Sequence, residues 1–176
     1  FVTICTRKRE CLFGNVSNGI TRLNDAGKMV AQWFRELENK FMDVQCDAFV
    51  CMPNHIHFIV INVGADLRVC PESTWGEHIG SPLLQHIVQW FKTMTTNHYI
   101  RGVKQHGWQP FPGKLWQRNY WEHIVRNETE CNSIREYIHS NPLQWELDQL
   151  HPNQPEYTDR LTSRAIPLRF TLHSHQ

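Results

Sequence analysis

Two histidines flank one apolar residue at the head of an apolar run, His55-Ile56-His57, which continues to Ile61. Aliphatic and aromatic residues dominate the run, which is typical of a β-strand. Because side chains alternate across a strand, both imidazoles project from one face and can bind one metal ion as a pair. The strand is apolar on both faces, which indicates a central, covered strand whose imidazoles need polar partners. A metal ion is one such partner, and ordinary packing of two histidines is the alternative.

A second group of residues that could do chemistry lies near residue 140. Tyr137 and Asn141 are four positions apart, so in a helix they share one face, beside an apolar stripe. If that stripe packs on the sheet, Tyr137 comes close to the sheet surface, where a phenol can act as a nucleophile. The alternatives are a tyrosine at the core edge with its hydroxyl in water, and an asparagine that only ends the helix.

Positive charge and aromatic rings gather between residues 92 and 126, although the net charge of the whole chain is only +1. This segment contains a single acid, Glu122. Its cations are Lys92, Arg101, Lys104, Lys114, Arg118 and Arg126. Aromatic residues lie between them, and we expect Tyr120 to stack on bases. Cations and aromatic faces suit the phosphates and bases of single-stranded nucleic acid. A solvated basic face beside an aromatic core is the alternative.

The composition limits the classes of protein to which the chain can belong. A chain of 176 residues with 40% hydrophobic residues and seven tryptophans suits one folded domain with a sizeable core. No apolar run approaches the roughly 18 residues of a membrane span, so we expect no membrane partner. Six cysteines occur without a C-x-x-C pair, which argues against a zinc ribbon. We therefore expect reduced thiols in a cytoplasmic protein.

Hydrophobic periodicity predicts the order of the elements. We expect strands over 1–6, 44–51 and 55–61, helices over 25–41, 82–101 and 127–140, and an extended segment over 115–126. We expect loops over 64–81 and over 7–22, the latter with or without a short hairpin. The order β-α-β-β-α-β predicts an α+β, ferredoxin-like antiparallel sheet, with an additional C-terminal helix that carries Tyr137. We expect one domain over residues 1–150 and a tail over 151–176.

Three blocks of sequence together resemble a known family. They are Met52-Pro53-Asn54-His55-Ile56-His57, the stretch from Leu115 to Asn127, and Tyr137-Ile138-His139-Ser140-Asn141-Pro142. In this order and spacing they resemble the REP-associated tyrosine transposases, single-tyrosine members of the HUH nuclease superfamily. The resemblance covers roughly residues 1–150, and its fold is the ferredoxin-like one.

The resemblance implies roles for the residues singled out above. His55, His57 and Asn141 match the ligands of a divalent metal, Mg²⁺ or Mn²⁺, and Tyr137 matches the nucleophile. The implied activity is cleavage and rejoining of single-stranded DNA beside a hairpin, often a repetitive extragenic palindrome, through a 5′-phosphotyrosine. The cations of residues 92–126 would then hold phosphates, in a monomer or a homodimer. The alternatives are an inactive single-stranded nucleic-acid-binding protein on the same fold, a hydrolase that uses activated water, and a non-catalytic zinc protein.

Overall fold

The computed structural model describes residues 1–63 and 82–154, so the expected loop over 64–81 and the end of the expected tail lie outside the described residues. The strands are β1 (Val2–Cys5), β2 (Gly14–Ser17), β3 (Ile20–Leu23), β4 (Val44–Cys51), β5 (His55–Asn62) and β6 (Trp121–Glu122). The α-helices are α1 (Asp25–Lys40), α2 (Pro82–His106) and α3 (Glu128–Ser140). Two 3₁₀ helices complete the elements, η1 (Arg7–Arg9) and η2 (Asn141–Leu147).

The main sheet has the strand order β4-β5-β1-β6, and every neighbouring pair is antiparallel. The expected tight connection at Pro53-Asn54 joins β4 to β5 as a hairpin. Along the β1–β5 pair, Thr3 lies opposite His57 and Cys5 lies opposite His55. The prediction of an α+β protein built on an antiparallel sheet is therefore confirmed.

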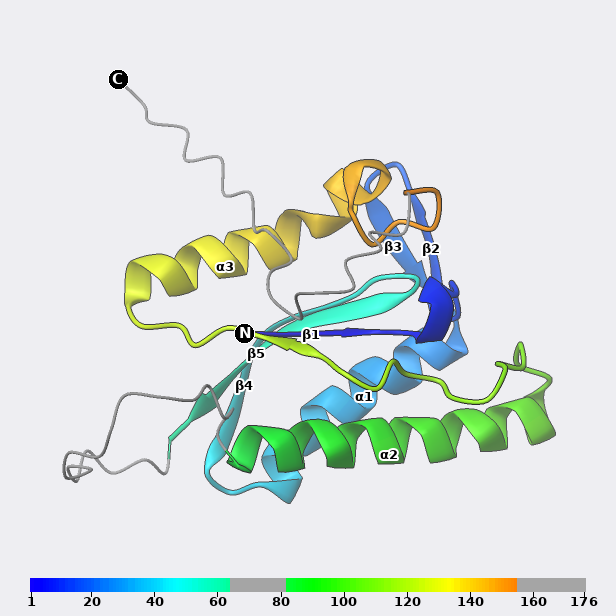
Figure 1. The fold of residues 1–176 in the computed structure, drawn as a ribbon, viewed down its shortest axis with the longest axis horizontal. Coiled ribbons are helices and arrows are strands. Elements are labelled where there is room, and N and C mark those ends of the chain that lie inside the picture. Colours follow the sequence, from blue (N-terminus) through cyan, green and yellow to red (C-terminus); the bar gives the residue numbers. More distant parts are fainter. Residues whose placement is uncertain (64–81, 155–176) are drawn as a thin grey trace.

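The sheet separates two layers of helices (Figure 1). Helices α1 and α2 pack on one face, and α3 lies over the other. Alternation along the strands explains this division, because Ile4, Ile56 and Phe58 point toward α1 and α2. On the opposite face, Ile59 packs with the buried stripe of α3, which includes Ile134. The two histidines of β5 point to this second face, beneath α3.

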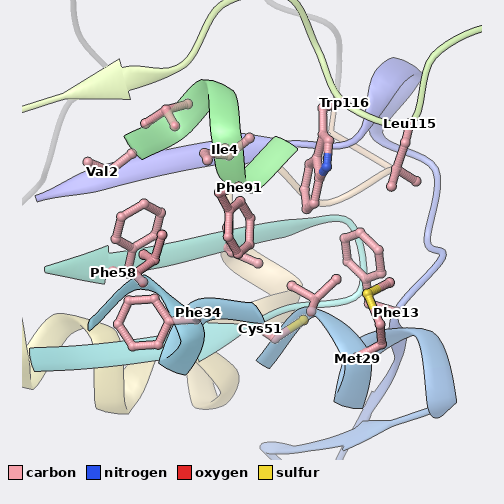
Figure 2. Packing of buried hydrophobic residues seen from close by; sticks show 14 of the residues in the cluster. Val2, Ile4, Phe13, Met29, Phe34, Cys51, Phe58, Phe91, Leu115 and Trp116 are labelled. Atoms are coloured by element: carbon pink, nitrogen blue, oxygen red, sulfur yellow. The ribbon is translucent and has the colours of Figure 1, made fainter. Parts of the chain in front are cut away.

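The larger core lies between the sheet and helices α1 and α2, and Figure 2 shows how its rings meet. The ring of Phe34 from α1 lies 5.5 Å from that of Phe58 from β5, and Phe58 lies 6.2 Å from Phe91 of α2. Phe91 in turn lies 6.0 Å from Trp116. Burial of such rings contributes on the order of 2 kcal/mol each. This core makes β5 a rigid support for the histidines on its other face.

The helix starts follow the sequence signals. The Asn24 side chain accepts a hydrogen bond from Gly27 N at 2.9 Å, so Asn24 rather than Asp25 caps α1. At α3, the Asn127 side chain accepts from Glu130 N at 2.8 Å. In a capping box, the side chain of the third helical residue would accept a hydrogen bond from the N-cap backbone in return. Here the Glu130 carboxylate accepts from Arg126 N instead of from Asn127 N.

The stretch over 7–22 holds η1 and the short hairpin β2–β3, whose turn places Asn18 and Gly19 at φ of 53° and 71°. Helix α2 and the segment over 115–126 differ from their sequence-based prediction. Helix α2 continues past the expected end at 101, because Gly102 lets the ring of Trp108 pack against the helix; a Cβ there would lie 2.2 Å from that ring. The contact with the Trp108 ring therefore stabilises the helix at a residue type that would otherwise weaken it.

The extended segment over 115–126 is shorter than expected. Only Trp121–Glu122 of that segment forms a strand, because the Lys92 ammonium binds the backbone carbonyls of residues 117–119. After α3 the chain continues as η2, and Trp145 and Leu150 are buried. None of the helices in the described part of the chain has an apolar stretch long enough to cross a membrane.

Candidate metal and tyrosine site

The two histidines are held by the pairing of β5 with β1. Both are essentially inaccessible, at 0% and 1% exposure for His55 and His57, and their rings lie 4.6 Å apart. Thr3, opposite His57 on β1, places its hydroxyl oxygen 2.8 Å from His57 Nδ1. This hydrogen bond occupies one ring nitrogen and turns the other, Nε2, toward α3.

His55 is oriented in the same way by its sequence neighbour. Asn54 is fully buried, and its amide nitrogen donates to the carbonyls of Arg9 at 3.1 Å and Leu150 at 2.7 Å. These two bonds fix the amide orientation, so Asn54 Oδ1 faces His55 Nδ1 at 2.7 Å and accepts a hydrogen bond from it. Nε2 of His55 therefore keeps its lone pair, as a metal ligand requires.

Helix α3 brings the tyrosine over this pair. Ile134 and Ile138 are fully buried against the sheet, and Arg135 reaches back to β4, with Nη2 2.6 Å from the Asp47 carboxylate. In this position the Tyr137 hydroxyl lies 3.4 Å from His57 Nε2. The structure thus brings together a phenol and an imidazole that are 80 positions apart in the chain.

The end of α3 and the following η2 close the pocket. Asn141 is 3% exposed, and its Nδ2 lies 3.4 Å from Asp148 Oδ2. Asp148 Oδ2 also lies 3.7 Å from His55 Nε2, and the Trp145 ring lies 6.1 Å from that of His55. Sequence reasoning missed Asp148, because a single acid in an aperiodic segment carries no spacing pattern.

The donor atoms in this pocket fit a metal ion. One ligand atom from each of His55, His57 and Asp148 lies within 4.8 Å of the other two. Among the described residues three buried side-chain atoms have no hydrogen-bond partner, and two of them are here: His55 Nε2 and Asn141 Oδ1. A buried acceptor without a partner costs about 1–3 kcal/mol, and a divalent cation would satisfy both atoms at once.

Burial governs the protonation of the pocket. It lowers the pKa of His55 to about 3, and together with the neighbouring His55 it lowers the pKa of His57. Both rings are therefore neutral at pH 7, and His55 and Asp148 do not form an ion pair. Burial, with the Asp148 charge in second place, raises the pKa of the Tyr137 phenol. Without a cation beside it, that phenol stays protonated.

Four of the expected DNA-binding residues line a groove of about 500 Å³ between α2 and residues 113–120: Lys92, Lys114, Arg118 and Tyr120. Its other polar lining comes from amide and hydroxyl side chains of α2 and from the amide of Gln117, and no acid is present among its described lining residues. Lys92 is not a free cation, because its ammonium donates to the three carbonyls of residues 117–119 and covers the Tyr120 ring at 5.4 Å. Lys114 and Arg118 are exposed.

The remaining expected residues lie elsewhere. Arg101 and Lys104 are exposed on α2 but do not line this groove, and Arg126 lines a separate cavity of about 610 Å³ near the start of α3. Among the other tyrosines, Tyr99 is buried and donates to Gln109 O, and Tyr120 lies under Lys92. Tyr137 is thus the tyrosine that the described structure places in the histidine pocket.

The chain is similar to a curated protein and, weakly, to a solved structure. No protein-family model matches the chain. A solved structure from Deinococcus radiodurans R1, described as a candidate transposase, has a TM-score of 0.44 at 16% identity and covers 78% of this chain and 85% of its own. That similarity is too low to support a fold or a function.

The curated protein is from Haemophilus influenzae, is described as uncharacterised, and is 37% identical over 162 residues. The matched residues make up 86% of this chain and 83% of the relative. At this identity and coverage, the chain belongs to the same family as the Haemophilus influenzae protein.

Proposed function

We propose that this protein is a metal-dependent, single-stranded DNA endonuclease and strand transferase that uses Tyr137 as its nucleophile. The observation that carries the proposal is the position of the Tyr137 hydroxyl, 3.4 Å from His57 Nε2, in a buried pocket that also holds His55, Asn141 and Asp148. The half-buried ring of Tyr137 packs against Phe1 and His57, and this packing directs its hydroxyl to the donor set, where an activated phenol is a nucleophile for phosphoryl transfer.

The arrangement of the fold supports the same proposal. The order of strands and helices, with the antiparallel sheet order β4-β5-β1-β6, supports the ferredoxin-like domain that we propose. The tyrosine helix α3 then packs on the sheet face opposite α1 and α2. These features agree with the resemblance to REP-associated tyrosine transposases, which the motifs around His55, Asn119 and Tyr137 carry.

The chemistry assigned to Tyr137 is a transesterification. Its Oη attacks the scissile phosphorus, so an Oη–P bond forms and the P–O3′ bond breaks. The phenolic proton is lost to solvent, and the leaving 3′ oxygen takes up a proton. The products are a 5′-phosphotyrosine and a free 3′-OH, and attack by another 3′-OH reverses the step and rejoins the strands. The phosphodiester is exchanged rather than hydrolysed, so no external energy source is needed.

The histidines would hold a divalent ion, Mg²⁺ or Mn²⁺, with Asn141 as a third ligand. Such an ion supplies polarisation of the scissile phosphate and offsets negative charge as it develops. The raised pKa of Tyr137 makes a neighbouring cation necessary, because a buried phenol loses its proton only when charge compensates it. Asn54 keeps His55 in the tautomer whose Nε2 can bind a metal ion, and Thr3 holds the orientation of the His57 ring through its Nδ1.

The substrate we propose is single-stranded DNA with a nearby hairpin. The groove along α2 supports it, since exposed Lys114 and Arg118 can bind phosphates while the amide and hydroxyl groups of α2 can contact bases. Helices α2 and α3 lie on opposite sides of the sheet (Figure 1). A strand bound in the groove along α2 would therefore pass around the sheet edge to reach Tyr137 of α3.

The test is a covalent-adduct assay. The protein is incubated with labelled hairpin-bearing single-stranded oligonucleotides and Mn²⁺, and the products are run on a denaturing gel. We expect a protein-linked band and a free 3′-OH fragment, both lost in Tyr137→Phe and kept in Tyr120→Phe. Oligonucleotide binding by Tyr137→Phe should stay within about threefold of wild type. Cleavage with a free 5′-phosphate and no adduct would indicate a water-dependent hydrolase, and binding without cleavage would indicate a binding protein.

A further inference from the structure

Asp148 lies in the wall of the histidine pocket and is not part of the His55-Ile56-His57 motif. Its side chain is 8% exposed, and its two carboxylate oxygens face different groups. Oδ1 accepts a hydrogen bond from Leu150 N at 2.7 Å and fixes the turn after η2. Oδ2 points into the pocket, 3.7 Å from His55 Nε2 and 3.4 Å from Asn141 Nδ2.

The turn alone does not explain why this carboxylate is buried. Both pocket contacts of Oδ2 are longer than the 2.7–2.9 Å of a charge-assisted hydrogen bond. A buried carboxylate needs a cation or strong donors, because removing its charge from water is costly. The acid two positions earlier shows the contrast, since the Glu146 side chain is 83% exposed. Asp148 therefore lies where a cation is expected to sit.

We propose that Asp148 is a ligand of the metal ion, together with His55, His57 and Asn141, and that its charge lets the site bind a divalent ion before DNA arrives. This inference rests on the proposed function and deepens it. Without Asp148 the donors are two imidazoles and an amide, all neutral, and the ion would depend on substrate phosphate for charge compensation. A carboxylate also supplies the hard oxygen ligand that Mg²⁺ and Mn²⁺ prefer.

The ligand also gives a role to the segment after the tyrosine helix. Trp145 is buried against the His55 ring, and the Leu150 carbonyl accepts from Asn54, the residue that orients His55. The Arg9 guanidinium holds the Gln149 carbonyl at 2.9 Å. These contacts fix the segment on both sides of Asp148, as a ligand position requires.

The test is titration of the full chain with Mn²⁺ by calorimetry, without DNA. Asp148→Asn keeps an oxygen for Leu150 N but removes the charge, and Glu146→Gln is the matched control on the same segment. We expect Asp148→Asn to weaken Mn²⁺ binding at least tenfold, and Glu146→Gln to stay within twofold of wild type. Thermal unfolding in EDTA establishes that each variant is folded. Wild-type affinity in folded Asp148→Asn would overturn the proposal.

A second variant keeps the proposal testable if Asp148→Asn does not fold. Asp148→Cys places a thiolate at the same position, and Co²⁺ bound by a thiolate gives a charge-transfer absorption that oxygen and nitrogen ligands do not. We expect this band in Asp148→Cys and not in Glu146→Cys. A folded Asp148→Cys that binds Co²⁺ without the band would contradict direct ligation.

Failure of this inference can be told apart from failure of the proposed function. The titration is done without DNA, so its result does not depend on whether Tyr137 acts as the nucleophile. If Asp148→Asn loses Mn²⁺ binding and wild type forms no covalent adduct, Asp148 is a metal ligand but the protein is not a strand transferase. If wild type forms the adduct and Asp148→Asn binds Mn²⁺ normally, the protein is a strand transferase but Asp148 is not a metal ligand.

Discussion

At the scale of single residues, the site depends on two imidazoles kept neutral and aimed by their neighbours. Thr3 and Asn54 occupy the Nδ1 atoms of His57 and His55, and burial lowers the pKa of both rings. The sequence identified the histidines because strand alternation is a strict rule. It could not identify Thr3, because the partner of His57 depends on the β1–β5 register, which no local pattern specifies.

Removal of the Thr3 hydroxyl should weaken metal binding. Thr3→Val has nearly the same shape but leaves His57 Nδ1 without its partner, so the ring loses the contact that holds its orientation. We expect about a tenfold loss of Mn²⁺ affinity by calorimetry, in the range of outer-shell substitutions. Thr3→Ser keeps the hydroxyl and should stay within about threefold of wild type. Equal affinities of Thr3→Val and Thr3→Ser would show that this hydroxyl has no such role.

The neutral histidines should also make the metal-free protein sensitive to acid. The pKa of His55 is about 3 in the folded state against 6.5 as the ordinary value, so only the unfolded state takes up the proton between these values. Stability is therefore present above pH 6.5 and is lost as the pH falls. For His55 alone the loss is about 3 kcal/mol between pH 6.5 and pH 4.

Urea unfolding in EDTA between pH 7 and pH 4 measures this loss. His55→Gln should show a clearly smaller fall in the free energy of unfolding over that range. His139→Gln, which changes an exposed histidine on α3, should behave like wild type. If His55→Gln has the same pH dependence as wild type, the buried ring is not the group that titrates.

At the scale of elements, helix α3 completes the site because it places Tyr137 beside the histidine pair. Its buried stripe and its contact with β4 through Arg135 set the height of Tyr137 above the sheet. The period of the stripe predicted this helix and its apolar face from the sequence alone. The continuation into η2 was not predictable, since Pro142 marks the end of an α-helix and gives no information on a following 3₁₀ turn.

The N-cap of α3 offers a test at this scale. Asn127→Ala removes the acceptor of Glu130 N and should lower the free energy of unfolding by about 1 kcal/mol. Asn127→Asp keeps an acceptor and should be nearly neutral in chemical denaturation. An Asn127→Ala variant as stable as wild type would mean that packing alone holds the start of the tyrosine helix.

At the scale of the whole molecule, the sheet separates the tyrosine pocket from the basic groove. The charge pattern indicated a nucleic-acid surface but not its location, because Lys92 bonds to backbone while Arg101 and Lys104 lie outside the groove. The order of elements was predictable from periodicity. Which cations meet depends on the non-helical path of residues 113–120 beside α2, and periodicity does not encode that path.

Loss of Lys114 and Arg118 should weaken binding of single-stranded DNA by charge. We expect the double alanine variant to lose affinity at 100 mM salt and to lower the slope of log K against log salt by roughly 1.4, for two phosphate contacts. A matched double variant of Arg35 and Lys40, exposed on α1, should leave both quantities unchanged. Fluorescence anisotropy with a labelled oligonucleotide in EDTA measures both. An unchanged slope in the groove variant would place the DNA elsewhere.

The central claim is that Tyr137 forms the bond to DNA, and mass spectrometry of the trapped adduct tests it most directly. The covalent product formed with Mn²⁺ is digested by nuclease and protease, and peptide fragmentation locates the residual nucleotide. We expect it on Tyr137, and on none of Tyr99, Tyr120 and Tyr157. A nucleotide on any other residue, or no modified peptide from an active preparation, would contradict the account.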